Sequence, residues 1–256
     1  MRAAEGAPRP GPPGPFRRAP PARYYAGCVS QAPAPPARDA ADRPGLFLTF
    51  EGGDGVGKTT QTRILAEALR AEGVEVLVTR EPGGTDLGAE IRRLLLDGGH
   101  VDPRAEALLY AADRAHHVAT LVRPALERGA VVVSDRYLDS SVAYQGAARS
   151  LGAEDVRSLS LWATGGLLPD RTILLDADPA LADRRTNGRG GRDRLERESD
   201  AFRAALREQF LALADAEPER IVVVDAAQPI ETVTTAVRRA LDPLLDARSG
   251  PGGRGA

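Results

Sequence analysis

The chain has 256 residues, 42% of them hydrophobic, which suffices for one α/β domain with a sizeable core. Residues 45–256 carry 27 basic against 33 acidic residues, a balance that argues against binding nucleic acid through bulk positive charge. No apolar stretch has the length of a membrane span, and the single cysteine, Cys28, excludes an intrachain disulfide and a cysteine zinc site. We therefore expect a soluble, cytoplasmic protein without a membrane or nucleic-acid partner.

The two ends of the chain differ in composition from the middle. Residues 1–44 hold 11 of the 20 prolines and seven arginines against three acids, and residues 248–256 are rich in glycine and arginine. Such segments bury too little apolar surface to fold, so we expect a disordered leader, a folded domain over residues 45–247 and a disordered tail. An unstructured extension is favoured over a transit peptide because the leader lacks an amphipathic helix.

The folded part begins with the apolar run Leu46 to Phe50, which predicts a buried strand, and helical spacing of apolar residues predicts a helix over Thr59 to Glu72. A glycine-rich loop between a strand and a helix curls its backbone N–H groups around phosphate. A chance glycine-rich turn would not explain both flanking elements. The residues expected to bind nucleotide are Gly52, Gly53, Asp54, Gly55, Val56, Gly57, Lys58, Thr59 and Thr60.

Lys58 is the single lysine among 34 basic residues, and all the others are arginine. A compact ammonium fits over the β- and γ-phosphates, whereas a planar guanidinium would crowd the loop. The hydroxyl of Thr59 is placed to bind Mg²⁺. Lys58 is therefore the strongest single indication of function.

Four more apolar runs predict strands, and helical periodicity between the runs indicates a five-stranded parallel sheet flanked by helices. Ligands bind at the carboxyl ends of such strands, so the chemistry is expected on Glu51 to Thr60, Arg80 to Thr85, Asp135 to Tyr144 and the segment after Asp176. The runs are Glu75 to Thr79, Ala130 to Ser134, Arg171 to Asp176 and Arg220 to Asp225.

Two strand ends carry charged motifs. Arg80 to Thr85 contains a proline and two glycines that allow close approach of backbone to a ligand, although an ordinary turn favours the same residues. Asp135 is suited to hold a metal ion and Arg136 to grip a phosphate, with a salt-bridged strand end as the alternative.

Six arginines lie between residues 184 and 197, interrupted by three glycines. A mobile arginine lid over about 184–197 brings positive charge to a transferred phosphoryl group and excludes water. A merely basic surface loop is the alternative, but it would need no glycine hinges.

Together these motifs resemble the thymidylate kinase family from about Leu46 to Leu245, and the specific matches are Tyr110-Ala111-Ala112-Asp113-Arg114 and the run Asp135 to Gly146. The resemblance implies the P-loop nucleoside monophosphate kinase fold with a short lid. It also implies phosphorylation of dTMP to dTDP by ATP with Mg²⁺, in dTTP biosynthesis, by a homodimer. Because the phosphate loop holds no arginine, the chain resembles the bacterial members that supply a catalytic arginine from the lid.

The resemblance also implies roles for single residues. Asp54 would bind the sugar 3′-hydroxyl, and Tyr144 would stand near C2′. Tyr110 would stack on thymine. The dTMP phosphate would be held by Arg80 and Arg136, assisted by Arg92. The base edge would be contacted by Arg114, Ser141 and Gln145. The catalytic group would comprise Lys58, Arg136 and one of Arg189, Arg192 and Arg194, and the metal ligands would be Thr59 and Asp135.

Two alternatives to this function stay open, namely a kinase for another nucleoside monophosphate and a non-catalytic nucleotide-binding module. A GTPase is excluded, because one asparagine, Asn187, and one lysine cannot form the guanine-recognition motif. Helix-surface or loop positions are expected for His100, His116 and His117, and Trp162 is expected in the core or a subunit interface.

Overall fold

The computed structural model describes residues 45–148, 151–186 and 199–249. The predicted leader, the lid arginines Arg189, Arg192, Arg194 and Arg197, and the tail after Ser249 lie outside these residues. The tail prediction began at residue 248, whereas the last helix continues through Ser249.

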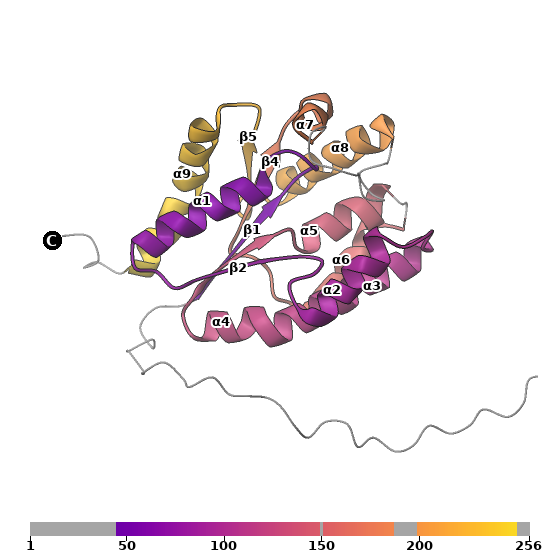
Figure 1. The fold of residues 1–256 in the computed structure, drawn as a ribbon, viewed down its shortest axis with the longest axis horizontal. Coiled ribbons are helices and arrows are strands. Elements are labelled where there is room, and N and C mark those ends of the chain that lie inside the picture. The colour runs from indigo at the N-terminus through magenta and orange to yellow at the C-terminus, as the bar shows by residue number, and fades with distance from the viewer. Residues whose placement is uncertain (1–44, 149–150, 187–198, 250–256) are drawn as a thin grey trace, which may run out of the picture. The chain divides into compact units, whose positions relative to one another are not determined.

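The described residues contain a five-stranded parallel sheet, as the sequence predicted (Figure 1). The strand order in the structure is β2-β3-β1-β4-β5. The strands are β1 Leu46–Glu51, β2 Val76–Arg80, β3 Val131–Asp135, β4 Arg171–Asp176 and β5 Ile221–Asp225. The predicted strands are confirmed to within one residue at each end. Arg80 belongs to β2 because it continues the ladder opposite Asp135 of β3.

Helices cover both faces of the sheet. Their order along the chain is α1 Lys58–Ala71, α2 Asp86–Leu96, α3 Pro103–His117, α4 Arg123–Glu127, α5 Leu138–Ser141, α6 Ala153–Thr164, α7 Pro179–Thr186, α8 Asp200–Ala216 and α9 Ile230–Ser249. Two π-helical segments, η2 Val118–Val122 and η3 Val142–Ala148, extend α3 and α5. Pro124 is the second residue of α4, which follows η2 directly, and the missing proline N–H interrupts the regular helical ladder there.

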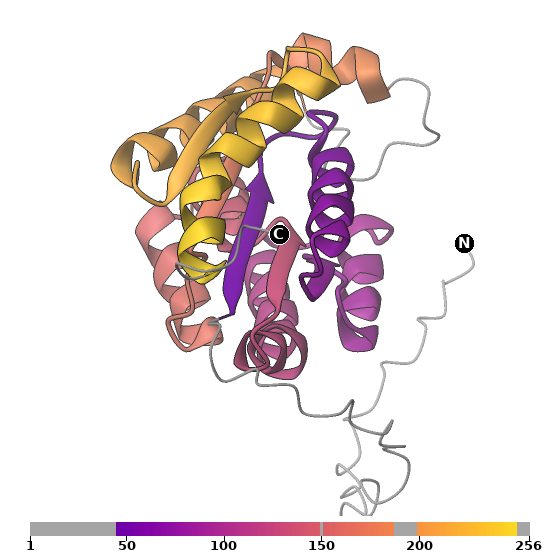
Figure 2. The same cartoon turned by 90° about the vertical axis from the view of Figure 1, so that its left-hand side faces the viewer.

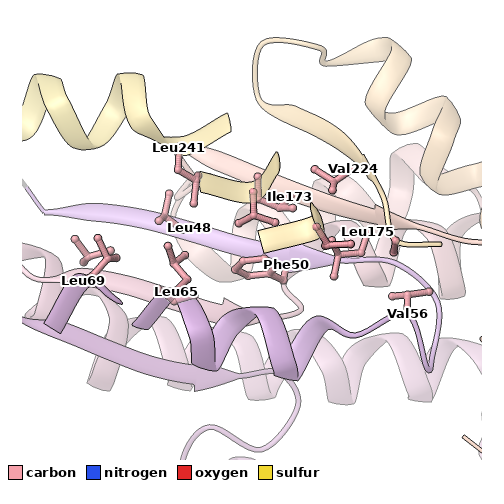
Figure 3. Packing of buried hydrophobic residues seen from close by; sticks show 14 of the residues in the cluster. Leu48, Phe50, Val56, Leu65, Leu69, Ile173, Leu175, Val224 and Leu241 are labelled. Atoms are coloured by element: carbon pink, nitrogen blue, oxygen red, sulfur yellow. The ribbon is translucent and has the colours of Figure 1, made fainter. Parts of the chain in front are cut away.

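The central strand β1 is buried along its whole length, and its side chains alternate between two cores. On one face, Leu48 and Phe50 pack against α1 and α9. Figure 3 shows Leu65 and Leu69 of α1 and Leu241 of α9 pointing toward these two strand residues. Figures 1 and 2 show α1 and α9 together on that side of the sheet.

On the opposite face, Phe47 packs against η2, α4 and α5, with its ring edge-on to Tyr137 at 4.9 Å between centroids. A third core joins β4 and β5 to α8 and η3 through residues that include Leu174, Leu206 and Phe210. Because these helices anchor the strand ends, the carboxyl edge of the sheet presents loops of defined geometry. At that edge, Asp135 of β3 is paired with Phe50 of β1 on one side and with Arg80 of β2 on the other.

Candidate active site

The loop after β1 has the backbone that a phosphate cradle requires. Gly52 has φ 126°, and a Cβ there would lie 2.3 Å from the carbonyl oxygen of Leu175. Gly57 has φ 103° and stands directly before α1, whose first residue is Lys58. The loop therefore needs glycine at these two positions, and it delivers its N–H groups at a helix N-terminus, where anions bind.

The Lys58 side chain is buried against the loop that it follows. Its Nζ donates to the carbonyl oxygens of Gly53 at 2.6 Å and Gly52 at 3.1 Å, and lies 4.0 Å from Asp54. Burial lowers the pKa of Lys58, and the neighbouring Arg136 lowers it further. The ammonium is thus held inside the cradle, where a larger guanidinium would meet the loop backbone.

Thr59 and Asp135 come together where α1 begins and β3 ends. The Thr59 hydroxyl donates to Asp135 Oδ2 at 2.7 Å. A hydroxyl and a carboxylate side by side at a phosphate loop match the hard oxygen ligands of Mg²⁺, which binds through one or two protein groups and the phosphates of its nucleotide. These two predicted metal ligands therefore fit that ion.

Arg136 links the phosphate loop to the segment after β3. It has φ 72°, a conformation unusual for a residue with a side chain, and its N–H donates to the carbonyl of Phe50 at 2.9 Å. Its guanidinium donates to Asp54 at 2.5 Å, Gly52 O at 3.0 Å and Ser140 at 3.0 Å. This set of bonds places a cation between the loop and the pocket described below.

Asp54 is the acceptor that Arg136 and Tyr144 share. Burial favours the protonated acid, but the charges of Arg136 and Lys58 outweigh it, so the pKa of Asp54 is lowered from its ordinary value. Burial raises the pKa of Tyr144, which keeps its hydroxyl protonated, and that hydroxyl donates to Asp54 Oδ2 at 3.2 Å. The carboxylate is an ionised acceptor at the border of the pocket.

A pocket opens beside this pair, with an empty volume of about 610 Å³ that includes open solvent at its mouth. Eight of the nine predicted substrate-binding residues line it, although they come from the phosphate loop, α2, α3 and the segment after β3. Its lining comprises Asp54, Glu81, Pro82, Arg92, Leu96, Tyr110, Arg114, Arg136, Tyr137, Ser140, Ser141, Tyr144 and Gln145. The fold therefore brings these eight predicted residues together around one pocket.

Arg80 is the ninth residue, and it lies in a neighbouring pocket that also contains Thr59 and Asp135. The turn at Gly83 separates it from Arg92, since a Cβ at Gly83 would be 3.0 Å from the Arg92 side chain and 3.8 Å from Arg80 Nε. Arg92 also donates to Pro82 O at 3.1 Å. The two arginines therefore flank one turn between the two pockets.

Arg114 is fully buried, and each of its nitrogens is held. Nε donates to Glu81 at 2.7 Å, Nη1 to Ser160 at 2.9 Å, and Nη2 to Ser141 at 2.9 Å. Burial favours loss of the proton, but the Glu81 carboxylate outweighs it and raises the pKa of Arg114. The guanidinium is thus a rigid, permanently charged donor group in the pocket wall.

Glu51 begins one of the segments on which the chemistry was expected, but no individual role was predicted for it. It is wholly buried at the end of β1, and it accepts from Tyr137 N at 2.8 Å, Ser140 N at 3.1 Å and Ser140 Oγ at 2.5 Å. Burial, with the charge of Asp139, raises its pKa to about 7. Through these bonds Glu51 fixes the turn that positions Arg136. In the sequence, a single acidic residue at the end of an apolar strand could have indicated this role.

Three sequence expectations need correction. His117 is fully buried, not on a helix surface or in a loop, because its ring bonds Glu81 at 2.8 Å and Thr79 at 2.7 Å. Trp162 was expected in the core or a subunit interface; it is 82% exposed, so the core position is wrong and the interface stays a prediction. Arg184 and Arg185, assigned to the lid, belong to helix α7, where Arg185 donates to Ala226 O at 2.8 Å.

Known proteins match this chain over almost all of its described part. The family described as Thymidylate kinase matches residues 50–237. The chain belongs to the thymidylate kinase family. The thymidylate kinase of Leifsonia xyli subsp. xyli is 62% identical over 203 residues, covering 78% of this chain and 96% of that protein. That of Clavibacter michiganensis subsp. michiganensis is 60% identical over 205 residues, covering 79% and 97%.

A solved structure agrees with the fold. The thymidylate kinase from Ehrlichia chaffeensis superposes with a TM-score of 0.65 at 32% identity, covering 78% of this chain and 99% of that one. The five-stranded parallel sheet with flanking helices is thus the fold of this family, as the resemblance implied. Among the described residues, no helix has both the length and the apolar character needed to cross a membrane.

Proposed function

We propose that the chain transfers the γ-phosphoryl group of ATP to a phosphate oxygen of dTMP and releases dTDP and ADP, a step in dTTP synthesis. The observation that carries this proposal is the Asp54–Arg136 ion pair, which joins the phosphate loop to the adjacent pocket. A triphosphate in the loop and a monophosphate in the pocket would meet at Arg136. Membership of the thymidylate kinase family supports dTMP as the acceptor.

The chemistry requires positioning and charge neutralisation. A phosphate monoester already carries a negative acceptor oxygen near neutral pH, so no general base is needed. Lys58 would neutralise charge on the transferred group, and Arg136, with Arg80 and Arg92, would hold the acceptor phosphate against the repulsion of two polyanions. Arg189, Arg192 and Arg194 lie outside the described residues, and a catalytic arginine among them stays a prediction.

Thr59 and Asp135 are the residues that we propose for Mg²⁺. Their oxygens lie 2.7 Å apart at the start of α1, beside the loop that would hold the phosphates. When bound there, the ion would supply positive charge to the phosphate oxygens. The role of the chain is to keep the two ligand oxygens together at that end of the loop.

The pocket would take the nucleoside part of dTMP. Asp54 would accept from the 3′-hydroxyl, and the Tyr144 ring would occupy the space that a ribose 2′-hydroxyl needs. Tyr110 would stack on the base. The base edge would be met by Arg114, Ser141 and Gln145, all of which line the pocket.

The proposal is tested by measuring ADP release from ATP and Mg²⁺ with dTMP, dUMP, dCMP, dGMP and dAMP offered separately. Turnover selective for dTMP, lost in Lys58→Ala, is the expected result. Preference for another monophosphate would transfer the assignment to a related kinase. ATP binding without acceptor-dependent turnover would indicate a binding module.

We also propose that two copies of the chain associate through α2, α3 and α6. Helix α3 contacts both α2 and α6, and the three helices carry exposed apolar side chains: Leu87, Leu94, Leu108 and Trp162. Trp162 is the most exposed of the large hydrophobic residues in the described part of the chain, and large apolar side chains left exposed can mark an interface. Sedimentation should give a dimer that Trp162→Glu weakens, whereas a monomeric parent protein would refute the proposal.

A cytoplasmic location is proposed as well. The chain contains one cysteine, which suits a reducing compartment because no intrachain disulfide can form. Fractionation of cells followed by the dTMP-dependent assay tests this location.

A further inference from the structure

Glu106 is a buried carboxylate at the edge of the proposed base pocket. It lies on α3, four residues before Tyr110, so both side chains leave the same face of the helix, and Tyr110 lines the pocket. The Glu106 side chain is 1% exposed. A carboxylate buried to this degree requires a partner, and its position near the N-terminal end of α3 stabilises its negative charge.

Glu106 bonds the pocket residue Gln145. The Gln145 Nε2 amide donates to Glu106 Oε1 at 2.8 Å, and both residues are buried. An ionised carboxylate only accepts hydrogen bonds, whereas the two ends of an amide differ, one donating and the other accepting. Glu106 therefore decides which way the amide is turned. With Nε2 held by Glu106, the acceptor that Gln145 offers is Oε1.

Arg114 provides the complementary group on the same helix. Its guanidinium is fixed by Glu81, Ser160 and Ser141, and it lines the same pocket as Gln145. A guanidinium only donates. The pocket wall thus combines Arg114, which can only donate hydrogen bonds, with Gln145, whose acceptor oxygen faces the pocket only if Glu106 holds the amide nitrogen.

This combination distinguishes two kinds of pyrimidine. Thymine and uracil have an acceptor, O4, next to a donor, N3–H. Cytosine has the reverse arrangement, an amino donor next to the N3 acceptor. A donor at Arg114 and an acceptor at Gln145 match the first pattern, and against cytosine they would leave like groups facing each other, which is costly in a buried site.

We infer that Glu106 is a positioning residue that gives the pocket its selectivity for 4-oxo over 4-amino pyrimidines by orienting the Gln145 amide. It acts through Gln145 and does not touch the substrate. The inference rests on the proposed function, because it requires the pyrimidine to occupy this pocket.

The test is Glu106→Gln, which keeps the size of the side chain but allows it to donate, so that the Gln145 amide can turn over. The readout is kcat/KM for dTMP, dUMP and dCMP. The ratio of dUMP to dCMP isolates the base edge, and we expect it to fall about tenfold to a hundredfold, mainly through KM for dUMP. The ratio of dTMP to dUMP reports the 5-methyl group and should stay unchanged, as should KM for ATP.

A double-mutant cycle separates positioning from a general structural effect. In a Gln145→Ala background, Glu106→Gln should cause no further loss of the dUMP to dCMP ratio, because the group through which it acts is gone. If Glu106→Gln lowers the dUMP to dCMP ratio equally in the parent and in the Gln145→Ala variant, the inference is overturned. A parental ratio in the Glu106→Gln single variant would also overturn it. Glu90→Gln, at an exposed position of α2, is the matched control and should behave like the parent.

If Glu106→Gln does not fold, Glu106→Asp tests the same contact, since the shorter carboxylate cannot keep the 2.8 Å bond to the Gln145 amide. A decrease in the ratio of kcat/KM for dUMP to that for dCMP supports the inference, and an unchanged ratio refutes it. Absence of dTMP turnover in the parent protein would instead contradict the proposed function, so the two failures are distinguishable.

Discussion

The Arg136 guanidinium lies 2.5 Å from the Asp54 carboxylate, although the two residues are 82 positions apart in the chain. The pair joins the phosphate loop to the segment after β3, and therefore places the proposed donor and acceptor sites at one cation. Asp54→Asn keeps the shape but removes the charge that aligns Arg136. We expect kcat/KM for dTMP to fall on the order of a hundredfold, as for other misplaced reacting groups.

Steady-state kinetics with dTMP as the varied substrate checks this prediction. Asp215→Asn, at an exposed position of α8, removes an equal charge away from the site and should leave kcat/KM unchanged. Parental kinetics in Asp54→Asn would show that the ion pair does not position Arg136.

Lys58→Arg should inactivate the enzyme even though it conserves the charge. The Lys58 side chain is 7% exposed and its Nζ is 2.6 Å from the Gly53 carbonyl, so the wider guanidinium has no room within the loop. We expect kcat to fall about a hundredfold or more, within the range for losing one transition-state contact. Binding of dTMP, measured by calorimetry, should remain, and turnover close to that of the parent would contradict the steric argument.

Glu51 makes stability depend on pH. Its pKa is raised from 4.5 to about 7, chiefly by burial, so the folded state holds a proton that the unfolded state releases above pH 4.5. This contribution is complete below pH 4.5 and is lost as pH rises through about 7, on the order of 3 kcal/mol in total.

Glu51→Gln removes this titration and can preserve the bonds to Tyr137 N and Ser140. The stability of the variant relative to the parent should therefore increase between pH 5 and pH 8, as measured by urea unfolding at intervals of half a pH unit. A difference that stays constant over that range would show that Glu51 does not titrate there.

Gly52 and Gly53 are adjacent glycines with different requirements. A Cβ at Gly52 would lie 2.3 Å from the Leu175 carbonyl at φ 126°, whereas at Gly53 the nearest atom would be 3.9 Å away. We expect Gly52→Ala to lower the free energy of unfolding by about 2 kcal/mol or more, and Gly53→Ala by less than about 1 kcal/mol. Denaturant unfolding of both variants checks this, and equal losses would refute it.

Much of the site could be predicted from the sequence because its signals are local. The five strands are short apolar runs, and the phosphate loop is one continuous segment whose glycines and Lys58 follow from the geometry of a bound phosphate. The motif at Asp135 and Arg136 follows a strand, so its place at the carboxyl edge of the sheet followed from the parallel topology.

Tertiary structure decided the partners of the buried charges. The sequence does not indicate that Glu81 binds both Arg114 and His117, or that Glu106 meets Gln145 39 residues away. It also misplaced His117, because an ionisable residue on a helix is usually exposed and only the packing of α3 against β2 and its following turn buries this one.

The sequence by itself determined the order of elements, the phosphate loop and the identity of the charged groups at the strand ends, because strand, turn and helix preferences act between near neighbours. Only the tertiary structure decided which way Arg114 and Gln145 are turned. Those orientations depend on hydrogen bonds to side chains far away along the chain, within a buried site where an unpaired polar group is too costly to persist.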